Sequence, residues 1–447
     1  MLVAGTNAQP THLYLFFYEK NPAAPVALIE KSSIVRRMSR VPSERLVLLV
    51  LAAIQFTHIM DFMVMMPLAP QLMRELDLGA GQFSALVAAY SIAAGIVGLL
   101  SAPFIDRFDR RTLLLVAYAG FTVATLLCGL ATNAHTLLIA RAIGGGFGGV
   151  SGSLCLAIVS DLVPPERRAA GIGIVMTAFA VAAAIGVPVG LQVANLWGWR
   201  TPFLGVAAVG VIVWIIVFRM VPPVRGHLQS GADKGRAFRE LLQDRNAGRA
   251  ILFMAVMVIG HFSIIPLLSS HLVGDVALPE KYLFLVYMIG GALSVITAPR
   301  VGRLADRYGR QRIFTIMVLA ASVVILAIAN AGPLPVWATL TLAGLFFVFA
   351  SGRFVPGQAI LTLAVPSSRR GAFLSLSSCA RDLASGISST LGGWIVSKQP
   401  NGHLVHFSWL GWIAAAGGLL SILLARTVHV NDKGAVSPLA TPTPEPG

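Results

Sequence analysis

The hydrophobic positions of this chain gather into long stretches that short polar segments separate. An α-helix rises about 1.5 Å per residue, so about twenty apolar residues cross a hydrocarbon core of about 30 Å. The pattern predicts an all-α polytopic membrane protein with twelve transmembrane helices in two six-helix halves. The predicted spans are 46–66, 83–104, 112–131, 136–160, 170–193 and 201–221, then 249–270, 282–302, 313–331, 336–356, 372–396 and 407–426.

Polar segments divide the chain into five parts. We expect a cytoplasmic N-terminal segment (1–44), a first half (45–221), a cytoplasmic linker (222–248), a second half (249–428) and a disordered, proline-rich cytoplasmic tail (429–447). The early apolar stretch LYLFFY is too short to span a membrane and has no basic residues before it, so it does not predict a cleavable signal peptide. We expect either Met1 or Met38 to be the first residue of the translated protein.

Composition agrees with a membrane protein, because 56% of the residues are hydrophobic and only 12% are charged. The net charge of +15 does not point to nucleic acid, because the basic residues follow the positive-inside rule. Most of the 34 Lys and Arg residues fall in segments that face the cytoplasm if the N-terminus is inside. We therefore expect both termini on the cytoplasmic side of the cell's inner membrane. Four basic residues lie in outer loops, namely Arg74, Arg200, Lys281 and Lys398.

A charged loop recurs after about two hundred residues. DRFDRR (106–111) lies between the second and third spans, and GRLADRYGRQRIF (302–314) lies between the eighth and ninth. Such a repeat indicates two related halves in the same orientation, that is, a pseudo-symmetric molecule. In the two copies, Asp106, Arg107 and Arg110 correspond to Asp306, Arg307 and Arg310.

The second copy carries a family resemblance. GRLADRYGRQ (302–311) resembles the signature Gly-x-Leu-Ala-Asp-Arg-x-Gly-Arg-Arg/Lys of the major facilitator superfamily. The first copy departs from it, with Ala102 and Asp109 where glycines are expected. RAIGGGFGG (141–149) resembles the Arg-x-x-x-Gly motif of the fourth helix. AIGVPVGLQVANLWGWRTPF (184–203) and THIMDFMVMMPLAP (57–70) resemble segments of proton-driven exporters of the drug and sugar efflux kind.

The resemblance implies a twelve-helix secondary transporter that works by alternating access, with a small-molecule substrate, protons and the lipid bilayer as partners. It implies no enzymatic activity and no cofactor, and we expect a monomer. The chain lacks a GxxxxGK[ST] loop, so ATP-driven transport is disfavoured, and no metal-ligand or nucleophile pattern occurs. Export of a small organic compound in exchange for protons is the leading hypothesis. Proton-coupled uptake of a small metabolite is the alternative, followed by a membrane receptor that has lost transport.

The repeated loops are candidate gates. A carboxylate at a helix end can pair with an Arg, or accept hydrogen bonds, at the start of a neighbouring helix. Such contacts would hold the inner face closed in one conformation. The alternative is that the charges only fix the orientation of the helices in the membrane, which is the role we expect for Arg110 and Arg111. The fifth span contains a proline between two glycines, a pattern that predicts a hinge. The gating candidates are Asp106, Arg107, Asp306, Arg307, Arg310, Gly302 and Gly309, and the hinge candidates are Gly186, Pro188 and Gly190.

Ionisable residues inside the predicted spans are the candidates for proton coupling and substrate contact, because an unpaired charge in lipid is costly. The helix rise places Asp61 and Arg141 at similar depth, so we expect them to pair across the first half, either as a proton site or as a permanent structural pair. His58 and His261 lie near the middle of equivalent spans and titrate near neutral pH.

Arg381 and Asp382 are adjacent in the eleventh span. Because successive helical residues point about 100° apart, we do not expect them to neutralise one another side by side. We expect one to face the cavity and the other a neighbouring helix, with Arg353 of the tenth span as a candidate neighbour. The cysteines Cys128, Cys155 and Cys379 all fall in apolar stretches and predict inert packing residues.

Overall fold

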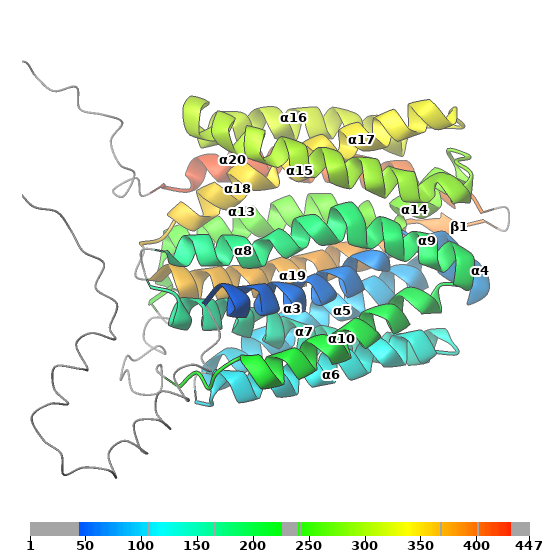
Figure 1. Ribbon diagram of the computed structural model, residues 1–447. Helices are drawn as coiled ribbons and strands as arrows, with labels where there is room; N and C mark the ends of the chain where they lie inside the picture. The colour runs from blue at the N-terminus through cyan, green and yellow to red at the C-terminus, as the bar shows by residue number, and fades with distance from the viewer. Residues whose placement is uncertain are drawn as a thin grey trace, which may run out of the picture. The chain divides into compact units, whose positions relative to one another are not determined.

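The computed structural model describes residues 44–105, 107–164, 167–225, 240–241, 243–366, 369–399 and 402–430. The expectations for the N-terminal segment, for most of the linker and for the tail lie outside these residues. Within them the chain forms long helices that lie side by side (Figure 1). We call the end that carries the β1–β2 hairpin (397–405) the hairpin end, and the opposite end, next to the linker 222–248, the linker end.

In the first half, the structure has a helix at each of the six predicted spans. Two spans are interrupted. The first span is followed, after a turn, by a short helix, and the fifth contains a π-helical segment between two α-helices. The elements are α3 (Glu44–Val64), α4 (Ala69–Glu75), α5 (Ala80–Ile105), α6 (Arg110–Leu130), α7 (Ala134–Leu162), α8 (Arg168–Val181), the π-helix η1 (Ala182–Gly186), α9 (Val187–Trp197) and α10 (Arg200–Met220).

The second half repeats this arrangement with two further breaks, at Ser263 to Ile264 and at Arg353. Its last two helices are joined by an antiparallel hairpin whose strands have two residues each. The sequence did not predict this hairpin. The elements are α13 (Arg245–Phe262), α14 (Ile265–Gly274), the 3-10 helix η2 (Glu280–Tyr282), α15 (Leu283–Tyr308), α16 (Arg310–Ala329), α17 (Val336–Gly352), α18 (Phe354–Leu363), α19 (Arg370–Ile395), β1 (Ser397–Lys398), β2 (Leu404–Val405) and α20 (Phe407–Thr427).

Eleven helices of the described chain are long and apolar enough to cross a membrane, some of them counted across a break. The predicted span that does not meet this criterion is the eleventh, α19, which has 26 residues but is too polar. Its serines at positions 377, 385, 388 and 389 are buried inside the protein, so they do not face lipid. A span whose polar face is covered by other helices can therefore cross a bilayer with a low average hydropathy.

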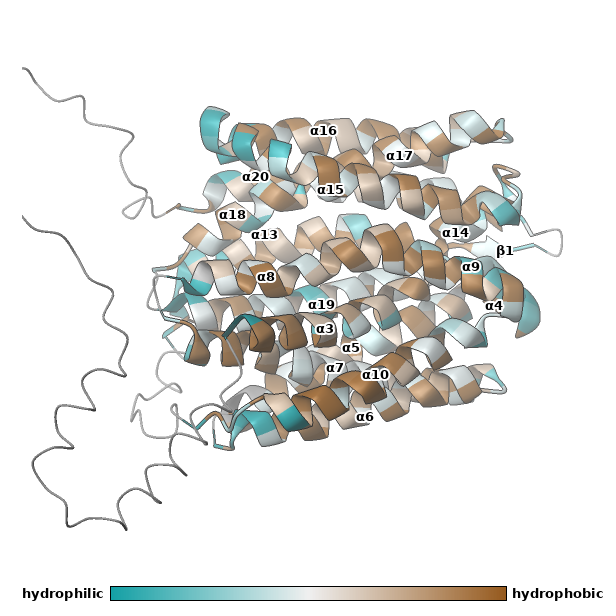
Figure 2. Cartoon of the chain, in the orientation of Figure 1, coloured by the Kyte–Doolittle hydropathy of each residue, from teal (hydrophilic) through white to brown (hydrophobic). Residues whose placement is uncertain are grey.

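The outer surface of the bundle fits a membrane. Its helix faces are apolar along the middle, and hydrophilic residues gather near the helix ends (Figure 2). Four tryptophans lie at helix ends on the hairpin end of the molecule, with exposures between 61% and 77%. Tryptophans are enriched at the membrane–water interface, so they mark the level of one interface. They are Trp197, Trp337, Trp394 and Trp409.

The two halves pack through helices whose backbones come close at glycines. A Cβ added at Gly95 of α5 would lie 2.9 Å from the carbonyl oxygen of Cys379 on α19. On the other side, a Cβ at Gly291 of α15 would lie 2.6 Å from the carbonyl oxygen of Ala183 in η1. Small residues at such contacts let helices approach without side chains between them. Two seams, α5–α19 and α15–η1–α9, therefore join the halves.

Candidate functional site

Asp61 and Arg141 form the buried ion pair that the sequence predicted. Asp61 lies in the last turn of α3 and Arg141 in the second turn of α7, and both side chains are at most 2% exposed. Arg141 Nη1 lies 2.8 Å from Asp61 Oδ2 and also donates to the Asp61 carbonyl oxygen at 3.2 Å. The guanidinium carbon lies 4.4 Å from the centre of the Tyr90 ring on α5. Removing either charge would leave the other buried without its partner, which is strongly destabilising.

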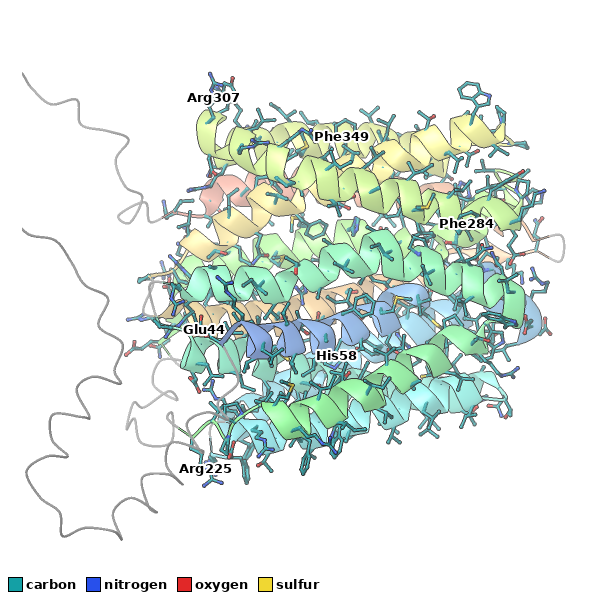
Figure 3. All side chains as sticks on the ribbon, in the orientation of Figure 1. Glu44, His58, Arg225, Phe284, Arg307 and Phe349 are labelled. Carbon is teal, nitrogen blue, oxygen red and sulfur yellow. The ribbon has the colours of Figure 1, made fainter. Side chains whose placement is uncertain are left out.

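His58 lies on the same face of α3, three residues before Asp61 (Figure 3). Its Nε2 lies 3.3 Å from the Ser151 hydroxyl of α7. The ring packs edge-on against Phe121, with centroids 4.2 Å apart. The Asp61–Arg141 and His58–Ser151 contacts thus connect α3 to α7 at two levels.

The second half places a histidine and an arginine on its equivalent helices. His261 lies in the last turn of α13, and its ring contacts Phe346 and Phe354, with centroids 6.1 and 5.1 Å apart. Arg353 lies at the break between α17 and α18 and is completely buried. Arg353 follows the start of α17 by seventeen residues, as Ser151 follows the start of α7. The two halves therefore carry different chemistry at corresponding positions.

An aromatic contact lies between these two sites. Phe62, the residue after Asp61, and Phe262, the residue after His261, lie with their ring centroids 6.0 Å apart. Phe62 also lies 5.5 Å from the Tyr90 ring, which covers Arg141. The contact joins α3 of the first half to α13 of the second. It therefore brings the residues next to Asp61 and His261 together at the interface between the halves.

The expectation for Arg381 and Asp382 was wrong, because the two side chains do pair. Arg381 Nε lies 3.3 Å from Asp382 Oδ1, and Nη2 donates to the Ser378 hydroxyl at 2.9 Å. The long arginine stem covers the angle between neighbouring positions, which the helical geometry of the Cβ atoms alone does not allow for. The described contacts of Arg381 are thus on α19 itself and do not include Arg353.

The predicted loop gates are only partly described, because Asp106 lies outside the described residues. Arg107 is exposed and lies over the Phe104 ring, with 5.4 Å between the guanidinium carbon and the ring centre. In the second copy, Asp306 pairs with Arg310 in the first turn of α16 at 3.7 Å, and its side chain is 72% exposed. An exposed pair of this kind contributes little stability. The gating role of this loop stays a prediction.

Other gating candidates have clear local roles. Arg307 lies at the end of α15 (Figure 3), with its guanidinium carbon 5.3 Å from the centre of the Tyr308 ring. Gly309 joins α15 to α16 with a φ of +95°, which favours glycine. Gly302 lies within α15, where an added Cβ would make only an ordinary contact with Val355 at 3.7 Å. Glycine is thus required by the backbone at 309 alone.

Asp109 occupies the position where the first loop departs from the repeated glycine. Its φ is −58°, so no glycine is needed, and its carboxylate caps α6 by accepting from the Arg111 backbone N–H at 2.9 Å. It also accepts from the Val224 N–H at 3.2 Å and from Arg225 Nε at 2.9 Å. Burial alone would raise the pKa of Asp109, but these hydrogen bonds outweigh it, so the pKa lies below its ordinary value. Asp109 ties the loop to the segment after α10.

Arg110 was expected to be a topological anchor, but it is buried and paired. Its Nη1 lies 3.1 Å from Asp161 Oδ2 near the end of α7, and its side chain is 7% exposed. Asp161 was missed because it lies fifty residues away in sequence, at the end of an apolar stretch. Asp109 could have been found, because an Asp directly before a helix is a common N-cap.

The π-helix η1 ends at Gly186, the first of the three predicted hinge residues. Pro188 lies in the first turn of α9, where a missing N–H is tolerated. A Cβ at Gly186 would lie 2.8 Å from Met60 Sδ, and one at Gly190 would lie 2.5 Å from Met60 Cε. These glycines therefore allow α3 to pack closely here, and π-helical segments often mark functional sites. Their conformational role remains a prediction.

Contacts at the hairpin end, which the sequence did not predict, join the two halves. Arg74 of α4 forms two hydrogen bonds with the Glu280 carboxylate of η2, at 3.0 and 3.5 Å. Lys398 Nζ of β1 donates to the carbonyl oxygen of Met73 at 3.2 Å. The Ser270 hydroxyl of α14 lies 3.4 Å from Met73 Sδ. We call these contacts the hairpin-end clamp.

Asp275, the residue after α14, holds the hairpin to the second half. Its carboxylate contacts His271 Nδ1 at 2.7 Å and His403 Nδ1 at 2.9 Å, and it accepts from the Leu404 N–H at 3.1 Å. His271 is fixed by the Ile328 carbonyl oxygen at 2.9 Å. Burial alone would raise the pKa of Asp275, but the hydrogen bonds from both histidines and Leu404 lower it below the ordinary value.

Replacing Asp275 with asparagine should lower the thermal unfolding midpoint, because the variant loses charge-assisted hydrogen bonds worth about 2 kcal/mol in total. The native pKa is depressed, so this stabilisation is present above the ordinary Asp pKa of about 3.9 and is lost as pH falls through the native value. Midpoints of both proteins, measured from pH 5 downward, should therefore converge below about pH 4. A constant difference down to pH 3 would contradict this assignment.

A membrane-embedded helical bundle with charged residues buried on equivalent helices of two repeated halves is typical of secondary transporters. Residues 51–352 match the family model described as Major Facilitator Superfamily. The chain therefore belongs to the major facilitator superfamily. It is a membrane transporter rather than an enzyme, and the predicted architecture of two six-helix halves is confirmed.

Individual relatives agree with this assignment. The "Uncharacterized MFS-type transporter YhcA" of Bacillus subtilis is 36% identical over 171 residues, which are 38% of this chain and 32% of that protein. A "Probable sugar efflux transporter" of Mannheimia succiniciproducens is 24% identical over 342 residues, covering 74% of this chain and 82% of that protein. The crystal structure of a D-xylose-proton symporter has the same fold, with a TM-score of 0.70, 18% identity and coverage of 89% and 100%.

Proposed function

We propose that this protein exports a small organic compound across the cell's inner membrane in exchange for protons. The observation that carries the proposal is the buried Asp61–Arg141 pair in the first half, with a separation of 2.8 Å and almost no exposure. A buried carboxylate is costly unless it is paired or protonated, so it is suited to take up a proton when its partner moves away. A similar protein is named as a probable sugar efflux transporter, which agrees with export.

In this proposal the proton and the conformation are linked through α3 and α7. Protonation of Asp61 neutralises the carboxylate and weakens its hold on Arg141, so the packing of α7 against α3 becomes less favourable. Deprotonation restores the pair. A ligand or proton shifts a two-state equilibrium only through its different affinity for the two states, and this pair supplies such a difference. The His58–Ser151 contact on the same two helices responds to the same movement.

We assign the hairpin end to the outside of the cell and the hairpin-end clamp to the closed outer gate. The clamp contacts connect α4 of the first half with η2, α14 and β1 of the second, so they must break when the halves separate there. The repeated loops at the linker end, including Asp106 and Asp306, would close the inner face in the opposite state. Alternating access requires one set of contacts to form as the other breaks.

Replacing Asp306 with asparagine should open the inner face. In a background without cysteines, a single cysteine at Ser160, near the linker end of α7, should be labelled several-fold faster in this variant, with lower transport turnover. Glu44 is the matched control, because its exposed carboxylate pairs with Arg167 within the first half at 3.0 Å. The Glu44→Gln variant should behave as the parent does. Unchanged labelling and intact transport in Asp306→Asn would leave the loop with a topological role only.

Proton-coupled uptake is the second candidate, because the fold is shared with a D-xylose-proton symporter. Purified protein in proteoliposomes with an imposed pH gradient separates the two. In the exporter, substrate should move against the direction of the protons, whereas in the symporter both should move together. A protein that binds substrate and moves none under either gradient would instead be the transport-inactive receptor.

A further inference from the structure

Arg353 is a completely buried cation without a counter-charge in the described part of the protein. None of its guanidinium nitrogens, Nε, Nη1 or Nη2, has a hydrogen-bond partner there. Buried charges are normally paired, because an uncompensated ion in the membrane interior costs several kcal/mol. The other buried membrane arginine, Arg141, has its carboxylate at 2.8 Å. The second half therefore holds a positive charge whose partner is missing.

The described acidic residues of the second half and of the linker before it are all engaged elsewhere. Each makes a hydrogen bond or an ion pair with a group other than Arg353, and most lie at the two ends of the bundle. No protein carboxylate in the described residues is thus left to neutralise Arg353. These pairings are Glu240–Arg369, Asp244 with the N–H groups of Asn246 and Ala247, Asp275 with His271 and His403, Glu280–Arg74, Asp306–Arg310 and Asp382–Arg381.

The surroundings of Arg353 suit an anion with an apolar body. The guanidinium carbon lies 5.9 Å from the Phe354 ring, and the Phe354 ring in turn contacts His261. His261 Nδ1 is also buried without a hydrogen-bond partner. A Cβ added at Gly418 of α20 would lie 3.5 Å from Arg353 Nη1 and 3.4 Å from the Ser322 hydroxyl of α16, so a second polar group lies near the guanidinium. Arg353 directly precedes α18, whose N-terminal dipole favours negative charge.

We propose that Arg353 is the binding residue for a carboxylate on the transported compound, so that the substrate class is organic anions with an aromatic or apolar body. Arginine binds carboxylates through two parallel hydrogen bonds, and its three unpartnered nitrogens are free for that geometry. Phe346, Phe354 and the His261 ring supply the apolar surface. The inference rests on the proposed transport function. It assigns the two halves separate tasks, with protons handled at Asp61 and the anion at Arg353.

The test compares benzoate, phenylacetate and 1-naphthoate with their neutral amides on the purified full-length protein in detergent. Unfolding is followed with a thiol-reactive dye, because the three cysteines are buried and become reactive only on unfolding. At least one carboxylate should raise the unfolding midpoint by several degrees, and its amide should not. The shift should vanish in Arg353→Met and shrink in Arg353→Lys, which keeps the charge but loses the two-pronged geometry. Equal shifts with an amide, a shift that survives in Arg353→Met, or no shift with any of the three acids would overturn the inference.

The unliganded variants provide an independent readout, because the molecule offers two buried arginines with opposite expectations. Arg353→Met should raise the midpoint of the ligand-free protein, since it removes an unpaired charge, whereas Arg141→Met should lower it, since it strands Asp61. A large decrease in both would show that Arg353 has a structural partner and would overturn the inference. If chloride alone produces the full shift and the carboxylates add nothing, the counter-ion is inorganic and the substrate class is wrong.

Transport separates this inference from the proposed function. If a carboxylate binds through Arg353 but no gradient drives its movement in proteoliposomes, the anion site stands and the transport proposal fails. If neutral compounds are transported and no carboxylate binds, the transport proposal stands and the anion site is refuted.

Discussion

The Asp61→Asn variant should lose all transport driven by a pH gradient, down to the level of protein-free liposomes, and should keep substrate binding. Asparagine preserves the shape and can still accept a hydrogen bond from Arg141, but it cannot exchange a proton. The ion pair that links the proton to the α3–α7 contact is then absent. Substrate exchange without a gradient should persist in part, because that reaction needs no net proton movement.

The measurement is gradient-driven transport at equal amounts of folded protein, since a change in abundance would imitate a loss of activity. Asp61→Glu should retain part of the activity, because it keeps the titrating group. Glu75→Gln is the control, since Glu75 is exposed on α4 and its carboxylate contacts only Gln71 in the described structure. If Asp61→Asn transports at the wild-type rate under a gradient, Asp61 has no part in coupling and the pair is structural.

The spans could be predicted from the sequence because the membrane imposes a length and a composition on each of them. Even α19 was predicted, although it is more polar than the other spans, since its 26 residues are long enough to cross a membrane. The breaks within spans were not predicted, except in the fifth span, where η1 ends at the hinge candidate Gly186. The break at Arg353 directly follows Gly352 and precedes Pro356 of α18, so the sequence carried a signal for it that the apolar length of the span concealed.

Pairing between charges was predictable only where the membrane restricts the choice. Asp61 and Arg141 were the charged residues at matching depth in the first half, so their contact followed from the helix rise. The contact between Arg74 and Glu280 joins residues 206 positions apart, at an end of the bundle where many charged residues occur. Sequence alone cannot choose among such partners, because the choice depends on how the two halves pack.

Gly145→Ala should be the most destabilising of the conservative substitutions in the first half. A Cβ at Gly145 of α7 would lie 2.1 Å from the carbonyl oxygen of Tyr90 and 2.7 Å from its Cα. These are backbone atoms of α5, so no side-chain rotation relieves the clash and the helices must separate. The neighbouring Gly144 is the matched control, because its Cβ would make ordinary contacts with Ala124 at 3.5 Å and Tyr90 Cε2 at 3.8 Å. Both substitutions raise helix propensity equally, by about 1 kcal/mol.

The two alanine variants therefore differ only in what the added methyl group meets. Gly144→Ala should keep or slightly raise the unfolding midpoint, whereas Gly145→Ala should lower it by many degrees and reduce the yield of folded protein. Arg141 lies one turn before Gly145 on the same side of α7. A displacement of α7 away from α5 should therefore also pull the guanidinium away from the Tyr90 ring and disturb its contact with Asp61. Any Gly145→Ala protein that remains folded should accordingly show weaker coupling to the pH gradient than Gly144→Ala. Equal midpoints and equal coupling in the two variants would mean that α5 and α7 are not held at this distance, and that the proton site does not depend on their contact.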